Sequence, residues 1–510
     1  MGGVVADGSG SAPVLADLVI QDGVVREVLP PGNEYGDGSD IVNCRGLVVS
    51  PGFVDIHTHS DLSLFSYPGN ESRVTQGITT EVVGNCGMTP APSSGDNAGL
   101  ALAIGPIDQV PDFEWTWNDF EGWFSALDAL PKATNVAAHV GHGSARFTVA
   151  GPQARPLTGE ELVDLDRELR IALECGAVGI SLGLMYAPGE GATMSELVQV
   201  ARTASDFDGV LSVHMRDYVG PGLLMAVHEL IEVVEQSGAR TEISHLRQSQ
   251  SRRMPRDSFT EVLDAVEGAR SRVNIAADAY PYLAGYTNLI QLFPSEIRGQ
   301  GATAITRFCR DHQKEAAAAL AASGYAIDDL IIMKARSAPE VMGKSAADLD
   351  GDKWLGLVGL LIANDCQVDV VLGGSNWADV DLGYERPWLN VASDGQAFGP
   401  RHSTSVVHPR SWGTFPAAYR RLRANGITIG ESVRRLSDGP ASQVGLSARL
   451  QPGHRADVTV FEEKTLDSAA TFQAPNKAAS GVRYVYVGGS AVLYDGVTTE
   501  ARPGQLIRRG

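Results

Sequence analysis

The sequence lacks several features that would place the protein in a specialised class. It has no apolar run near the ~18 residues of a membrane-spanning helix. Its start has no basic stretch followed by an apolar one, so we expect no secretory signal. Basic residues are outnumbered, with 41 Lys and Arg against 61 Asp and Glu and a formal net charge of −20. That negative surplus argues against nucleic acid or a membrane surface as a partner.

Cysteine is also scarce, with five in 510 residues, odd in number and widely scattered. This usage excludes a disulfide framework and predicts a reducing, cytoplasmic environment in which one cysteine could serve a function. The hydrophobic content of 43% and the charged content of 20% are typical of an ordinary globular protein.

The most informative feature that is present is the segment PGFVDIHTHSD at 51–61, where an apolar stretch over 46–56 runs into two histidines. Alternate side chains of a strand share one face, so His57 and His59 can both point at one metal ion from the strand's end. Considered alone, the segment fits a surface turn with two histidines equally well.

Other predicted strands also end in side chains that can bind a metal. These are Cys86 after 79–85, His214 after 209–213, His245 after 240–244 and Asp394 after 389–393. Three further apolar runs complete a set of eight strands: 135–140, 177–180 and 272–279. Helical patterns lie between some of them, as at 159–174 and 221–236. Alternating strands and helices predict an α/β fold, here a (β/α)8 TIM-like barrel, whose active site lies at the C-terminal strand ends.

The chain is longer than one ordinary domain, but its length suits a barrel of about 250 residues enlarged by insertions. We predict that the barrel spans 51–444. An insertion at about 288–350 interrupts it and contains a helical pattern over 302–320.

The two chain ends, 1–50 and 445–510, show short apolar runs separated by turn signals, such as Asp22-Gly23. Neither end is large enough to build a core alone. We therefore expect both ends to pair into one small β-sandwich domain beside the barrel.

Longer motifs follow one another along nearly the whole chain. They include PGFVDIHTHSD at 51–61, TTEVVGNCGMTPAP at 79–92, GAVGISLGLMYAPG at 176–189, DAYPYLAG at 278–285 and PGHRADVTVF at 452–461. In these motifs the chain resembles the amidohydrolase superfamily and, within it, the N-acyl-D-amino-acid deacylase (D-aminoacylase) family. The resemblance implies a zinc-dependent hydrolase of linear amides, with one tightly bound Zn²⁺ and a second, weaker metal position.

Related dinuclear enzymes bridge their metals with a carboxylated lysine, but this chain has no lysine between Lys132 and Lys314. Cys86 is the obvious substitute, because a thiolate is a strong, soft zinc ligand. The alternative for Cys86 is an ordinary buried thiol. The resemblance implies two metal positions, the tight one held by Cys86, His214 and His245 and the weaker one by His57, His59 and Asp394.

Asp394 is also the candidate catalytic residue. A bound metal lowers the pKa of its water toward about 7. A carboxylate must then take the proton and deliver it to the leaving amine, which is general acid–base catalysis. An Asp-Gly turn without chemistry is the alternative interpretation of this position.

By the same resemblance, four residues occupy positions that bind the substrate carboxylate: Tyr186, Arg247, Tyr280 and Arg410. A guanidinium fork suits such a group. Two features depart from the family pattern. Tyr286 stands where a small hydroxyl residue is usual, and the segment 396–407 is reworked.

These features predict an enzyme that cleaves an N-acyl-D-amino acid into a carboxylate and a D-amino acid. Because Tyr286 is bulky, another amide, such as a peptide-like secondary metabolite, is the alternative substrate. A metal-free assembly module is a third interpretation, but it predicts lost ligands, and all six are present. The expected partner is a small-molecule amide, and the sequence leaves the oligomeric state open.

Overall fold

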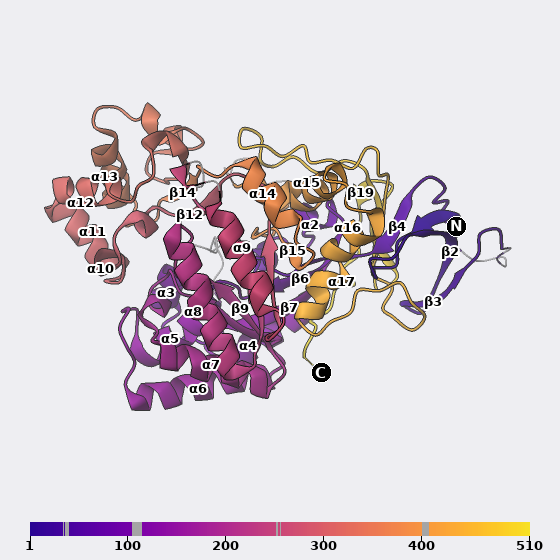
Figure 1. The fold of residues 1–510 in the computed structure, drawn as a ribbon, viewed down its shortest axis with the longest axis horizontal. Coiled ribbons are helices and arrows are strands. Elements are labelled where there is room, and N and C mark those ends of the chain that lie inside the picture. The colour runs from indigo at the N-terminus through magenta and orange to yellow at the C-terminus, as the bar shows by residue number, and fades with distance from the viewer. Residues whose placement is uncertain are drawn as a thin grey trace.

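The computed structural model describes residues 1–33, 35, 40–104, 115–250, 253–255, 257–399 and 407–509. Figure 1 shows a helix-covered barrel in the centre, an inserted lobe at the upper left and a sheet that carries the N-terminus at the right. Within the described ranges, no helix is both long enough and apolar enough to cross a membrane.

Eight parallel strands form the barrel, and their order in the sheet follows their order in the chain. They are β5 Phe53–Asp55, β6 Ile78–Val83, β7 Asn135–Gly141, β8 Gly179–Gly183, β9 Val210–His214, β10 Arg240–Ile243, β11 Ile275–Ala279 and β15 Leu389–Val391. Most of their side chains are buried on both faces, as expected of a parallel sheet covered by helices. The predicted α/β barrel is therefore confirmed.

The barrel closes where its last strand, β15, meets its first, β5. A parallel bridge joins Thr58 to Gly395 just beyond the two strands. The backbone N–H of Asp394 donates to the carbonyl of His57 at 2.8 Å, and that of His59 donates to the carbonyl of Gly395 at 2.8 Å. The residues expected to bind metal thus also complete the hydrogen-bonding of the barrel.

Helices wrap the outside of the barrel and continue beyond its last strand. They are α4 Phe120–Ala129, α5 His142–Ala150, α6 Gly159–Glu174, α7 Met194–Asp206, α8 Pro221–Ser237, α9 Ser258–Ala269, α14 Trp377–Tyr384, α15 Arg410–Ala424, α16 Ile429–Leu436 and α17 Asp438–Gln443. Shorter helices lie in the loops after β5 and β6: α1 Ser63–Ser66, α2 Glu71–Val74 and α3 Asn97–Ile104. The predicted helices at 159–174 and 221–236 correspond to α6 and α8. Helix α6 begins with a capping box at Thr158 and buries Leu165, Leu169 and Leu173, which recur every four residues.

The two chain ends build one eight-stranded sheet in the order β19-β18-β17-β16-β4-β1-β2-β3. Its strands are β1 Gly3–Val5, β2 Val14–Gln21, β3 Val24–Leu29, β4 Val48–Pro51, β16 Val458–Phe461, β17 Val482–Val487, β18 Ser490–Tyr494 and β19 Val497–Thr498. The ends meet where β4 pairs antiparallel with β16, with Val49 opposite Val460. The two chain ends thus share one sheet, and the hairpin expected at Asp22-Gly23 joins β2 to β3. A separate β-sandwich domain with the expected bounds stays a prediction.

The apolar stretch over 46–56 is divided between two strands, β4 and β5. Gly52 lies at the division, and its N–H donates to the carbonyl of Asp457 at 2.8 Å. A Cβ at position 52 would lie 2.0 Å from Thr79 Oγ1, so only glycine lets the chain pass there. The apolar pattern continues because both halves are buried, one in the terminal sheet and one in the barrel.

An inserted lobe lies between β11 and β15. It contains β12 Gly285–Asn288, α10 Ser295–Arg298, α11 Ala302–Asp311, α12 Gln313–Ala321, β13 Leu330–Lys334, α13 Lys353–Ala363 and β14 Asp369–Leu372. The helical pattern expected over 302–320 is confirmed as α11 and α12. The strands form a separate antiparallel sheet, β12-β14-β13, so the lobe's elements run on past residue 350. The lobe has its own core, with Leu320, Leu357 and Val370 fully buried.

Phe53 of barrel strand β5 packs against helix α15 and against β16 of the terminal sheet. Its truncation therefore tests how much this packing stabilises the fold. The ring is fully buried and lies 5.9 Å from the Phe415 ring of α15 and 6.0 Å from the Phe461 ring of β16. We expect Phe53→Ala to lower the free energy of unfolding by about 3–5 kcal/mol, measured by urea denaturation. Val163→Ala, at a side chain 66% exposed, is the control. Equal midpoints for the two variants would contradict this assignment.

Candidate metal centre

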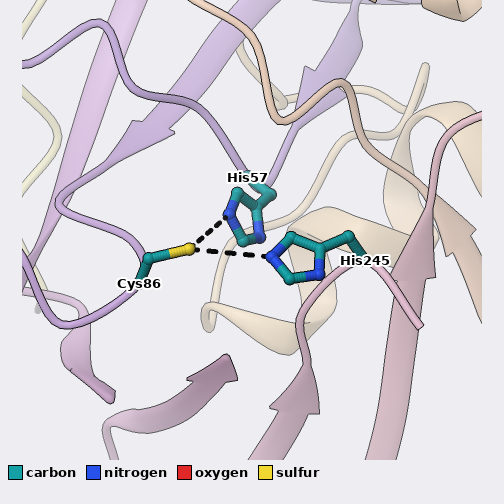
Figure 2. A group of neighbouring side chains, drawn as sticks. All are labelled: His57, Cys86 and His245. Atoms are coloured by element: carbon teal, nitrogen blue, oxygen red, sulfur yellow. Dashed lines mark hydrogen bonds between the residues drawn. The ribbon is translucent and has the colours of Figure 1, made fainter. Parts of the chain in front are cut away.

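The six predicted metal ligands gather at the C-terminal ends of the barrel strands, and Cys86 is central to the first donor group. Its Sγ lies 3.4 Å from His57 Nε2 and 3.4 Å from His214 Nδ1. The same sulfur lies 3.7 Å from His245 Nε2. Figure 2 shows that the rings of His57 and His245 each point one nitrogen at the Cys86 sulfur. Because His214 Nδ1 is also 3.0 Å from His245 Nε2, the donor atoms surround one small volume.

A second donor group adjoins the first and consists of His57, His59 and Asp394. Asp394 Oδ1 lies 3.1 Å from His59 Nε2 and 3.7 Å from His57 Nε2. All three side chains are buried. His57 faces both donor groups, so the two sets of ligands share a boundary.

Three of these ligands adopt backbone conformations that side chains other than glycine rarely accept. The φ angles are 55° at Cys86, 34° at His245 and 52° at Asp394. Each such left-handed residue costs about 1–3 kcal/mol unless its surroundings fix it, and strain of this kind gathers at functional sites. The turns after β6, β10 and β15 thus contain left-handed residues at positions where the amino-acid types do not predict them.

Burial sets the protonation of three of the four histidines in the donor groups. It lowers the pKa of His214 to about 3 and that of His59 to about 4, and it lowers the pKa of His245 well below its usual value. These rings are neutral near pH 7 and keep a lone pair for a metal ion. Burial also raises the pKa of the Cys86 thiol. A thiol that coordinates a metal ion is nevertheless deprotonated, because the cation stabilises the thiolate.

Arg410 is paired with the candidate base. Its Nη1 lies 2.5 Å from Asp394 Oδ2 and donates to the Tyr280 hydroxyl at 3.3 Å. Burial alone would raise the pKa of Asp394, but the Arg410 guanidinium and the neighbouring histidines hold it well below its usual range. Asp394 is therefore an ionised carboxylate with one oxygen toward the histidines and the other toward Arg410.

The four residues expected at the substrate all line one cavity beside the ligands: Tyr186, Arg247, Tyr280 and Arg410. Tyr286 lines the same cavity. Of the reworked segment 396–407, residues 400–406 lie outside the described residues. The residues expected at the substrate thus share one cavity, whereas the ion pair between Arg410 and Asp394 was not predicted.

Two supporting residues were not singled out from the sequence. Asp278 Oδ2 lies 3.4 Å from His57 Nδ1, and its Oδ1 accepts the backbone N–H of His245 at 2.7 Å. The Tyr218 hydroxyl accepts the N–H of Met215 at 2.9 Å and donates to the carbonyl of Ser244 at 3.1 Å. Asp278 stands within the DAYPYLAG motif at a strand end, the same signal that identified the other ligands.

Fold and donor groups together define a metal-dependent enzyme built on a parallel barrel. A family model described as "Amidohydrolase family" matches residues 40–285. A D-aminoacylase of Alcaligenes xylosoxydans xylosoxydans is 30% identical, covering 100% of this chain and 96% of that protein. An N-acyl-D-glutamate deacylase of the same organism is 31% identical, with the same two coverages.

Solved structures give the same result. A crystal structure of N-acyl-D-glutamate deacylase from Bordetella bronchiseptica, complexed with zinc and a phosphonate inhibitor that mimics the tetrahedral intermediate of the reaction, has a TM-score of 0.81. It is 30% identical and covers 99% of this chain and 98% of its own. The chain therefore belongs to the amidohydrolases and, among them, to the D-aminoacylase family.

His142 and Arg146 of helix α5 both pair with one buried carboxylate, that of Glu196. His142 Nε2 lies 2.8 Å from Glu196 Oε1, and Arg146 pairs with the same carboxylate oxygen. All three side chains are buried beneath the start of α7. They join α5 to α7 rather than facing the metal ligands.

Removing Glu196 should therefore destabilise the fold. Glu196→Ala leaves the fully buried Arg146 guanidinium without its counter-charge, and such a loss costs about 3–5 kcal/mol. We expect a clear fall in the urea midpoint, followed by circular dichroism. The matched control is Asp164→Ala, which breaks an ion pair with Arg167 whose side chains are 43% and 60% exposed. If both variants unfold at the same urea concentration, the buried cluster does not stabilise the fold.

Proposed function

We propose that this chain is a zinc-dependent hydrolase that cleaves a linear amide, an N-acyl-D-amino acid, into a carboxylate and a D-amino acid. The observation that carries the proposal is the meeting, in one cavity, of a Cys/His donor group, the ionised Asp394 and the Arg247 guanidinium. The activities named for the similar proteins support it. All six ligands lie together, which weighs against a metal-free assembly module.

The donor set suits zinc. Tetrahedral zinc with ordinary bond lengths separates two nitrogen ligands by about 3.3 Å, and sulfur from nitrogen by about 3.6 Å. Here His214 and His245 are 3.0 Å apart, and the Cys86 sulfur lies 3.4 and 3.7 Å from them. Thiolate and imidazole are also the ligands that zinc prefers. We assign the tight position to these three residues and the weaker one to His57, His59 and Asp394.

Bound zinc supplies a lowered pKa for the attacking water and polarises the scissile carbonyl. Asp394 would take a proton from the attacking water as the C–O bond forms, and would then give that proton to the nitrogen of the leaving amine as the C–N bond breaks. Arg410 keeps Asp394 ionised until it accepts the proton, and it fixes the direction of the carboxylate.

Arg247 is placed to receive the substrate's α-carboxylate, with Tyr186, Tyr280 and Arg410 around it. A Cβ at Gly285 would lie 1.9 Å from Arg247 Nη2, so the glycine makes room for the guanidinium. That guanidinium also lies 5.7 Å from the centre of the Tyr280 ring. A planar fork held on an aromatic face suits a carboxylate.

We also propose that the enzyme is cytoplasmic, that its substrate is a small molecule, and that it binds neither nucleic acid nor membranes. All five cysteines are free thiols, which suits a reducing compartment. The net charge of −20 opposes polyanionic partners.

Loss of Cys86 tests the metal assignment. Cys86→Ala should lose both the tightly bound zinc and the activity, because two histidines alone form an incomplete site. Elemental analysis of the purified protein measures the zinc, with Cys175→Ala as the control at a cysteine remote from the donor group. Full zinc retention in the Cys86 variant would refute the assignment.

Asp394→Ala tests proton transfer. The fold and the zinc at Cys86, His214 and His245 should remain, while kcat falls by about 10²–10⁴ or more. Steady-state kinetics on an N-acyl-D-amino acid, together with zinc content and circular dichroism, check this. Near-normal turnover by a folded, zinc-loaded variant would exclude Asp394 as the base.

A further inference from the structure

The cavity beside the donor groups has an aromatic wall. Five tyrosines line it, together with Met185, Val219 and Leu372: Tyr186, Tyr218, Tyr280, Tyr286 and Tyr325. Three of the hydroxyls have protein partners. The Tyr218 hydroxyl bonds to backbone groups, the Tyr280 hydroxyl accepts from Arg410, and the Tyr286 hydroxyl donates to Asp369 Oδ2 at 2.8 Å. With three of the five hydroxyls engaged in this way, the wall is made mainly of ring and aliphatic surface.

The cavity is lined by two cationic and two anionic side chains: Arg247, Arg410, Asp217 and Asp394. Arg410 is neutralised by Asp394 at 2.5 Å. Arg247 forms no ion pair within the part of the chain that the structure describes. Asp217 accepts the backbone N–H of Val219 at 2.8 Å and would repel an anion. The cavity therefore offers one unpaired positive charge, enough for a single carboxylate.

We infer that this site selects N-acyl-D-amino acids with one carboxylate and a neutral aromatic side chain, and that Tyr286 sets the preference. The inference rests on the proposed function and narrows its substrate. A second carboxylate, as in an N-acyl-D-glutamate, would lose its hydration against tyrosine rings without gaining a counter-charge. An aromatic side chain would instead gain ring-to-ring contacts, beyond the apolar area that it buries.

Tyr286 reaches the cavity from the inserted lobe rather than from a barrel strand. It stands on β12, where it pairs with Val371 of β14. Its hydroxyl is anchored on the fully buried Asp369, and its ring centre lies 5.8 Å from the Arg410 guanidinium carbon. The ring is thus held at a fixed place in the wall, while the metal ligands come from other elements.

The first experiment compares kcat/KM of the zinc-loaded enzyme on N-acetyl derivatives of D-phenylalanine, D-leucine, D-lysine, D-aspartate and D-glutamate. We expect D-phenylalanine to rank first and both acidic substrates to fall at least tenfold below it. A preference for the acidic substrates or for D-lysine would overturn the inference and leave the proposed function intact. No turnover of any N-acyl-D-amino acid would overturn both.

The second experiment uses two variants at one position. Tyr286→Ser removes the ring and should lower the ratio of D-phenylalanine to D-leucine activity by about 2–10-fold, the range of one aromatic pair. Tyr286→Phe keeps the ring and should keep the ratio. Zinc content and melting temperature establish that both variants are folded and loaded. An unchanged ratio in Tyr286→Ser would overturn the role of Tyr286.

A third variant tests whether the number of cationic side chains in the cavity decides the selection against acidic substrates. Leu372→Arg adds a cation to the aromatic wall and should raise the ratio of D-glutamate to D-phenylalanine activity at least tenfold. Leu372→Met is the matched control, because it lengthens the side chain without charge and should leave the ratio unchanged. Equal ratios in both variants would show that counter-charge does not decide the selection.

Discussion

Barrel closure and metal binding depend on the same few backbone hydrogen bonds. Where β5 meets β15, the N–H of Asp394 bonds to the carbonyl of His57, and the N–H of His59 bonds to that of Gly395. The ligands of the second donor group are therefore held in place by the hydrogen-bonding that closes the sheet. A site built in this way is preorganised, because its geometry is set by the scaffold rather than by flexible loops.

The first donor group relies on a different support. His245 and Cys86 both sit on left-handed backbone, which persists only where neighbours fix it. Asp278 provides such a contact, since one oxygen bonds to the N–H of His245 and the other faces His57 Nδ1. One carboxylate thus orients ligands from two strand ends.

The residues alone predicted the eight barrel strands and six candidate ligands at strand ends, because each follows from a local pattern that ends at a strand terminus. The four substrate positions came instead from the family resemblance, and Tyr218 and Tyr325 of the cavity were not singled out. The domain boundary was predicted at 50/51, but Gly52 was not identified as the point of division, since apolar residues continue across it. Nor did the sequence predict the pairing of Arg410 with Asp394 or the role of Asp278. Those contacts depend on strand register and loop path, and alternation along a strand specifies only which face a side chain takes.

The terminal sheet has a consequence for how the chain is made. Strand β4 leads directly into the first barrel strand, yet its neighbour β16 comes from the far end, so that Ser50 bonds to Thr459 409 positions away. Residues near the C-terminus also reach the barrel, with a bridge from Leu506 to Val136 of β7. Contacts between such distant segments form slowly and late. During synthesis on the ribosome, the first strands to emerge cannot complete their sheet until the segment that contains β16 to β19 has been made.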